Sequence, residues 1–260
     1  ASVLAVASWR LGEPRYGAEA RRLLDSLHRT HFQGGRWLRR SGPDAPLATS
    51  GDVAWLLDAH VSTFEQDGEV TELDRALRLV GDLLDGYWDA NRPSPDEVGA
   101  GRGLFQSHRD AVKLLVRAKD VLDGAVPSGS STAAVGLARL GQLTGDDGVR
   151  AVASRLVELG MPLLEQHPTA AATLLEASWR LDMGVEVVVP GPPSGVLAAA
   201  RRHAPPWSVI AFGRGPLALL DARRPDTLYV CRRSTCEAPV DDVASVARAL
   251  ETTTRGEAAR

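Results

Sequence analysis

The chain has 260 residues, of which 44% are hydrophobic and 24% are charged, and its formal net charge is −3. These values are typical of a globular protein, and they argue against a basic surface for nucleic acid or for an anionic membrane. No apolar run approaches the roughly 20 residues that cross a bilayer, so we expect a cytoplasmic protein that does not bind membranes.

Residues 1–10 lack the basic segment of a signal peptide and resemble the middle of a helix. We therefore expect the chain to be a fragment or a processed piece of a longer protein. Three later stretches place apolar side chains on one helical face, at spacings of three and four residues: 16–27, 52–64 and 70–84. Tight turns that would join such helices in pairs lie near three glycines: Gly12, Gly68 and Gly145.

Residues 1–182 are therefore predicted to form consecutive helical hairpins, joined by longer connections at 31–42 and 86–107. Such hairpins fit an α-solenoid, or part of an α/α toroid in which the inner helices begin at a common mouth. The fold class we predict is mainly α, a partial α/α toroid with a small C-terminal α/β unit.

The pattern changes near residue 183, and residues 183–260 are predicted to form the α/β unit. Short β-branched runs indicate three strands: 184–191, 207–213 and 227–232. Two helices are predicted among and after them: 194–203 and 240–253. Alternation of strands and helices favours parallel pairing of the strands.

No cofactor or metal is expected. The first predicted strand is followed by a proline-rich segment and lacks the glycine pattern of a dinucleotide site. Cys231 and Cys236 are too few for a disulfide scaffold, and two thiols cannot complete a zinc site. They are either structural or merely adjacent thiols, or else a redox pair.

Four segments in the same order carry a resemblance to a known family: 11–20, 86–107, 117–147 and 228–240. The third begins "RAKDVLDGAVPSGSS". Together they look like the C-terminal part of the spermatogenesis-associated protein 20 family, whose bacterial members are thioredoxin-domain-containing proteins. The resemblance implies an N-terminal thioredoxin-like domain, which is not in this sequence, and an α/α toroid similar to six-hairpin glycosidases and sugar 2-epimerases.

The resemblance also implies a site at the mouth of the toroid. Asp52 would open one inner helix, whereas Lys119, Asp120 and Asp123 lie in the loop before another. Two carboxylates and a lysine are suited to acid–base chemistry on a sugar, so these four residues are the catalytic candidates. The alternative is that Asp52 is a first-turn carboxylate and that the other three form local ion pairs in a solvated loop.

Four further residues are candidates for substrate binding: Trp55, Arg117, Ser128 and Ser131. For the two serines the alternative is capping of the helix that begins near residue 130. Several positions depart from the family pattern, and among them Gly51, Val126 and Ser130 stand where Glu, Glu and Asn are usual.

Two functions follow as expectations. The first is carbohydrate-related acid–base chemistry on a small-molecule sugar. The second is a non-catalytic binding or scaffolding domain that pairs with a missing N-terminal half, with another chain or with itself.

Overall fold

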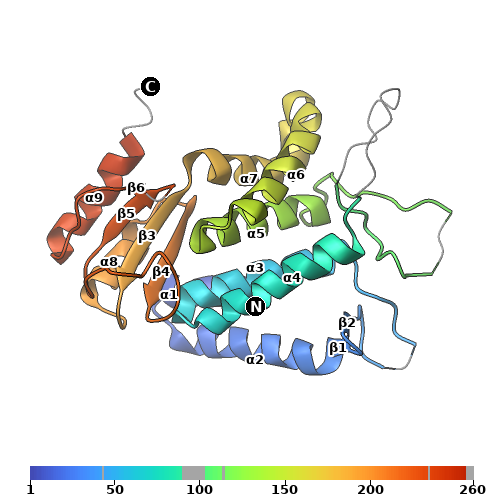
Figure 1. Ribbon diagram of the computed structural model, residues 1–260, viewed down its shortest axis with the longest axis horizontal. Coiled ribbons are helices and arrows are strands. Elements are labelled where there is room, and N and C mark those ends of the chain that lie inside the picture. The colour runs from blue at the N-terminus through green and yellow to red at the C-terminus, as the bar shows by residue number, and fades with distance from the viewer. Residues whose placement is uncertain (43, 90–102, 113–114, 234, 256–260) are drawn as a thin grey trace.

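The computed structural model describes residues 1–42, 44–89, 103–112, 115–233 and 235–255. These residues form nine α-helices, one short 3₁₀ helix, a two-stranded hairpin and a four-stranded sheet, so the protein is mainly helical, as predicted. Figure 1 shows most of the helices beside the small sheet, with α8 and α9 on the sheet's far side. Of the connection predicted at 86–107, residues 90–102 lie outside the described residues.

Within the described ranges, seven α-helices precede the sheet: α1 (Ser2–Arg10), α2 (Pro14–His31), α3 (Ser50–Asp67), α4 (Val70–Gly86), α5 (Gly129–Thr144), α6 (Asp147–Gln166) and α7 (Ala172–Met183). A short hairpin of β1 (Phe32–Gln33) and β2 (Arg36–Trp37) follows α2, and the 3₁₀ helix η1 (Pro168–Ala171) precedes α7. Gly12, Gly68 and Gly145 have φ angles of 68°, 77° and 70°. This left-handed conformation favours glycine and turns the chain back on itself, so the predicted hairpin joints are confirmed.

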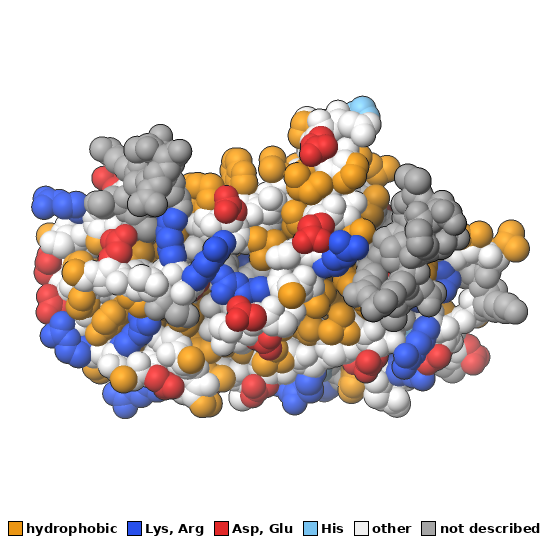
Figure 2. Space-filling model, turned by 45° about the horizontal axis from the view of Figure 1, so that its top comes forward, with side chains coloured by type: hydrophobic (Ala, Val, Ile, Leu, Met, Phe, Trp, Pro, Cys, Tyr) orange, Lys and Arg blue, Asp and Glu red, His pale blue; other side chains and the backbone are white. Residues whose placement is uncertain are grey.

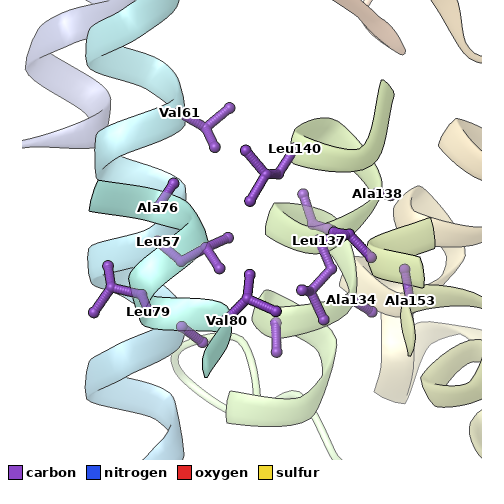
Figure 3. Close-up of a cluster of buried hydrophobic side chains, with 14 of the residues drawn as sticks. Leu57, Val61, Ala76, Leu79, Val80, Ala134, Leu137, Ala138, Leu140 and Ala153 are labelled. Carbon is purple, nitrogen blue, oxygen red and sulfur yellow. The ribbon is translucent and has the colours of Figure 1, made fainter. Parts of the chain in front are cut away.

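The helices are arranged in two layers. α1, α3, α5 and α7 contact one another in that order, and α2, α4 and α6 pack against them as their hairpin partners. Figure 3 shows the core between α3, α4 and α5, where Leu57 and Val61 of α3 meet Val80 of α4 and Leu137 and Leu140 of α5. α3 and α5 bury nearly all of their residues, so any polar side chain on them needs a partner.

The sheet consists of β3 (Val185–Pro190), β4 (Ser208–Gly213), β5 (Tyr229–Arg232) and β6 (Thr235–Cys236), in the order β4-β3-β5-β6. The helix α8 (Gly195–His203) joins β3 to β4, which pair in parallel as predicted. β5 pairs with β3 in the antiparallel direction, so the expectation of parallel strands is wrong there. The chain between β4 and β5 forms turns rather than the crossover helix that a parallel pair needs.

Both faces of the sheet are covered. Val188, Val209 and Ala211 belong to the hydrophobic core that the helical layers share. Val187 and Ile210 point to the other side and pack in a second core with α8 and α9 (Val243–Arg255). The predicted change of architecture therefore falls just after α7, and the sheet is joined to the helices by a common core.

The surface carries both charge signs. On the face in Figure 2, acidic and basic side chains are interspersed with hydrophobic ones. Among the described residues, no helix is both long and apolar enough to cross a membrane.

Candidate functional site

A cavity of about 300 Å³ lies where the layer of α1, α3, α5 and α7 meets the connection between α8 and β4. Each helix presents one face to it. In α3, Trp55, Asp58 and Glu65 share a face because they are three and seven residues apart. In the same way, α5 contributes Arg139 to the wall. The helix α7 contributes Glu176 and Arg180, which are four residues apart.

Arg139 is at the centre of a buried ion network. Its Nη1 donates to Oδ1 of Asp58 and, at 3.1 Å, to the hydroxyl of Ser62, while its Nη2 donates to Oε2 of Glu65 at 2.9 Å. The hydroxyl of Ser2 donates to the other oxygen of Asp58 at 2.5 Å. One guanidinium therefore holds two carboxylates of α3 and ties α3 to α5.

Two carboxylates surround the single guanidinium of this network. Burial alone would lower the pKa of Arg139, but Glu65 and Asp58 outweigh burial and raise that pKa above its ordinary value. Glu65 also accepts the backbone N–H of Ile210 in β4, at 3.3 Å, with its second oxygen. The network therefore also fixes the position of the sheet against the helical layer.

A second ion pair lies across the cavity. Nε of Arg180 donates to Oε1 of Glu176 at 2.9 Å, and its two terminal nitrogens donate to the carbonyls of Pro206 and Ser208. Burial lowers the pKa of Arg180, and so does the positive charge of Arg139. Arg180 is buried by these contacts, whereas the Glu176 side chain is 49% exposed and accessible to a ligand.

The aromatic part of the wall consists of Trp55 of α3 and Trp9 of α1. Trp55 is the more exposed of the two. It is 42% exposed and lies one turn before Asp58 on the same helical face. Trp55 also borders a second, more apolar groove beside α1 and α2, which Asp52 lines as well. Of the residues predicted from the sequence, Trp55 is the one that lines the cavity of about 300 Å³.

Asp52 lies at the start of α3 in a reciprocal cap. Its Oδ2 accepts the backbone N–H and the hydroxyl of Thr49, both at 2.8 Å, and its own N–H donates to the Thr49 hydroxyl. The first-turn alternative given for Asp52 is thus the arrangement found. The start of α5 is adjacent, since a Cβ on Gly129 would lie 3.0 Å from Cα of Gly51.

The two aspartates of the segment "RAKDVLDGAVPSGSS" hold the start of α5. Asp123 accepts the N–H groups of Ser128 at 2.9 Å and of Thr173 at 2.8 Å, and Asp120 accepts the N–H of Gly129 at 3.3 Å. Ser128 caps α5 and its hydroxyl donates to that of Ser131 at 2.8 Å, so the capping alternative is confirmed. The helix starts converge as predicted, but their carboxylates are engaged in holding backbone groups.

Lys119 and Arg117 lie to one side of this cluster. Nζ of Lys119 is 2.5 Å from Oδ2 of Asp89, and the Arg117 guanidinium lies 4.1 Å from the centre of the Phe105 ring. Arg117 also donates to the carbonyl of Ser107 at 2.5 Å. The ion pair of Lys119 is thus formed with Asp89, 30 residues away, rather than within its own loop as the alternative supposed. The catalytic role of Lys119 stays a prediction.

Comparison with known proteins gives no further guide. No protein-family model matches the chain, and no curated protein sequence matches it. The site is therefore argued from its own geometry.

The charged residues of the cavity were missed by motif reading, although the sequence carried a signal for them. Arg139 is the one charged residue in the sequence of α5, whose other residues are apolar or uncharged. A charge on such a helix must be paired when the helix is buried. On α3, Asp58 and Glu65 lie among apolar residues and share a face, and these are its partners.

The arrangement is better suited to binding than to proton transfer. Acid–base catalysis on a sugar needs one carboxyl that keeps a proton and one that is ionised. Here Asp58 and Glu65 share Arg139, and Glu176 is paired with Arg180, so each carboxylate faces a guanidinium. A guanidinium keeps its proton in proteins, so it cannot exchange one with the carboxylate. The cavity thus offers fixed hydrogen-bond acceptors and donors beside an indole ring.

Proposed function

We propose that the chain is part of an α/α toroid and that the cavity on its inner layer binds a small polyhydroxylated molecule of the sugar class. The toroid is supported by the order in which α1, α3, α5 and α7 contact one another, each with a hairpin partner or connection outside. It is also the fold that the resemblance in the sequence implies.

The observation that carries the proposal is the combination of Trp55 with the paired charges around it. A sugar ring has an apolar face that packs on an indole, and hydroxyl groups that both donate and accept hydrogen bonds. Glu176 offers an exposed acceptor, and the edge of the Arg139 network offers groups already held in place. The volume of about 300 Å³ is at the lower end of the range for small-molecule sites, roughly 300–1,000 Å³.

Binding without turnover is the form of this function that we propose. The four catalytic candidates do not line the cavity of Trp55, Asp58 and Arg139. Asp52, Asp120 and Asp123 each accept backbone N–H groups at a helix start, where a change of protonation would loosen the helix. A further proposal concerns the edge of the layer at α1, where Val3 is 80% exposed. This edge would pair with an N-terminal half, with another chain or with a second copy of this chain.

The experiment is a titration of the purified chain with a panel of monosaccharides and disaccharides, followed by tryptophan fluorescence and by product analysis. We expect a saturable change in fluorescence for at least one sugar, with no product formed. The Lys119→Met variant should bind that sugar as the parent does, because Lys119 does not line the cavity. A fluorescence signal that no sugar changes contradicts the binding proposal, whereas product formation abolished in Lys119→Met supports catalysis by the predicted residues instead.

A further inference from the structure

The C-terminal hairpin of β5 and β6 holds a disulfide whose surroundings are unlike those of a purely structural bridge. Cys231 and Cys236 face one another across the two strands and are bonded. Cys231 is 1% exposed, whereas Cys236 is partly exposed at the edge of the sheet. A reagent from solution therefore reaches one of the two sulfur atoms more readily than the other.

Arg223 binds both sulfur atoms at once. Its Nη1 lies 3.0 Å from Sγ of Cys231, and its Nη2 lies 3.1 Å from Sγ of Cys236. The guanidinium is also held 4.9 Å from the centre of the Tyr229 ring. A disulfide sulfur is a weak hydrogen-bond acceptor, but a thiolate carries a full charge, so these contacts stabilise the reduced pair more than the oxidised one.

A buried carboxyl lies beside the inner cysteine. Glu186 of β3 is paired directly with Cys231 of β5, and side chains at such positions have Cβ atoms roughly 4.5–5.5 Å apart. Glu186 is 2% exposed, and its Oε2 has no hydrogen-bond partner among the described residues. Burial raises the pKa of Glu186 to about 7, against the opposing effect of Arg150. This carboxyl can therefore give up or take a proton near neutral pH.

We propose that Cys231, Cys236 and Arg223 form a site for thiol–disulfide exchange with a small-molecule thiol such as glutathione. The proposal concerns the far side of the sheet from α8 and does not depend on sugar binding. It selects the redox-pair alternative for the two cysteines and assigns each sulfur a separate task.

The exchange proceeds in two balanced steps. A thiolate of the small molecule attacks Sγ of Cys236, the disulfide bond breaks, and its electron pair leaves on Sγ of Cys231, where Arg223 stabilises the negative charge. A second small thiolate then attacks the small-molecule sulfur of the mixed disulfide and releases Cys236 as a thiolate. Two small thiols are oxidised to one disulfide, and the protein pair gains two electrons. The protons lost by the small thiols return to the protein sulfurs, with Glu186 as a local donor for Cys231.

The first test measures the equilibrium with glutathione. The parent chain, Arg223→Gln and Arg224→Gln are equilibrated in buffers of varied reduced and oxidised glutathione, and free thiols are alkylated and counted by mass spectrometry. We expect Arg223→Gln to need about tenfold more reducing conditions, a shift of roughly 30 mV. Arg224→Gln should match the parent, because it is exposed and uses only its backbone N–H to contact Tyr229.

Two outcomes of this titration overturn the proposal. One is a curve for Arg223→Gln that coincides with that of the parent. The other is a parent disulfide that stays oxidised at every glutathione ratio.

The second test identifies the sulfur that is attacked. Each cysteine is replaced in turn by serine, the folded variants are exposed to oxidised glutathione, and the mass of the product is measured. We expect Cys231→Ser to accept one glutathione on Cys236, and Cys236→Ser to remain unmodified because Cys231 is buried. Equal modification of both variants, or modification of Cys236→Ser alone, contradicts the assignment.

Discussion

Arg139 ties α5 to α3 and also forms part of the cavity wall. Its guanidinium forms ion pairs with Asp58 and Glu65 and is buried apart from the cavity edge. A buried guanidinium without partners would be costly, and so would two buried carboxylates without a cation. The three residues therefore depend on one another, and removing one of them leaves the others uncompensated.

We predict that Arg139→Met lowers the free energy of unfolding by about 3–5 kcal/mol, because two carboxylates are left buried without a cation. Urea unfolding at neutral pH, followed by circular dichroism, measures the change. Arg155→Met is the control, because Arg155 and Glu158 form a pair near the surface of α6 and such pairs contribute at most about 1 kcal/mol. Similar losses in both variants would show that Arg139 is not buried in an ion network.

A pair of histidines, of which His60 is buried and His28 is half-buried, predicts how stability depends on pH. Nε2 of His28 lies 3.1 Å from Nε2 of His60, whose Nδ1 lies 2.6 Å from Oε2 of Glu72. Burial, together with the nearby His60, lowers the pKa of His28 to about 4 from its ordinary 6.5. Between these two values the unfolded chain binds a proton at this position and the folded chain does not.

The contribution of His28 is therefore fully present above pH 6.5 and is lost as the pH falls toward 4. We expect the difference in unfolding free energy between the parent and His28→Gln to change across this window and to be constant above it. The measurement is urea unfolding at a series of pH values. A profile in His28→Gln that is the same as that of the parent contradicts the prediction.

At the residue scale, local contacts were predictable and distant ones were not. The caps formed by Asp52 and Ser128 lie within three residues of their partners, and the sequence offered both as alternatives. The pair of Arg139 and Asp58 joins residues 81 positions apart. Its charge signal was visible on α5, but its partner depends on how the helices pack.

Among the elements, the helical hairpins were the most predictable because glycine and apolar spacing are local features. The strands were less so. β3 and β4 were predicted from their β-branched runs, whereas β6 has two residues and contains no such run. The direction of β5 depends on the path of the preceding chain, which forms turns instead of a helix, and no spacing within β5 encodes that.

The contact between α3 and α5 gives a prediction at this scale. A Cβ on Gly136 would lie 2.2 Å from Cδ2 of Leu57, which is fully buried. We expect Gly136→Val to destabilise the protein by about 1–3 kcal/mol, because the extra atoms force the two helices apart. Thermal unfolding compares it with Gly81→Val in α4, where a Cβ meets nothing within 4 Å. Equal stability of Gly136→Val and Gly81→Val would contradict close packing of α3 against α5 at Gly136.

In the whole molecule, the cavity exists because the helical layer and the sheet region meet. Its wall is mainly helical, but Pro206, just before β4, and Ser208, the first residue of β4, close it on one side and accept hydrogen bonds from Arg180. The sequence predicted the change of architecture near residue 182, and its motifs placed the candidate site at the helix starts. The sequence could not predict the cavity, because the cavity depends on the packing of two regions that have different sequence patterns.

The most direct measurement is isothermal titration calorimetry of the parent chain, Trp55→Ala and Trp179→Ala with a sugar that binds the parent. The two tryptophans are 42% and 52% exposed, and of these two only Trp55 lines the cavity, where Trp9 supplies the other indole of the wall. We expect Trp55→Ala to weaken binding about tenfold or more, since loss of ring packing is worth roughly 1.4 kcal/mol, and Trp179→Ala to bind as the parent does. Equal affinity in all three proteins would contradict sugar binding in this cavity.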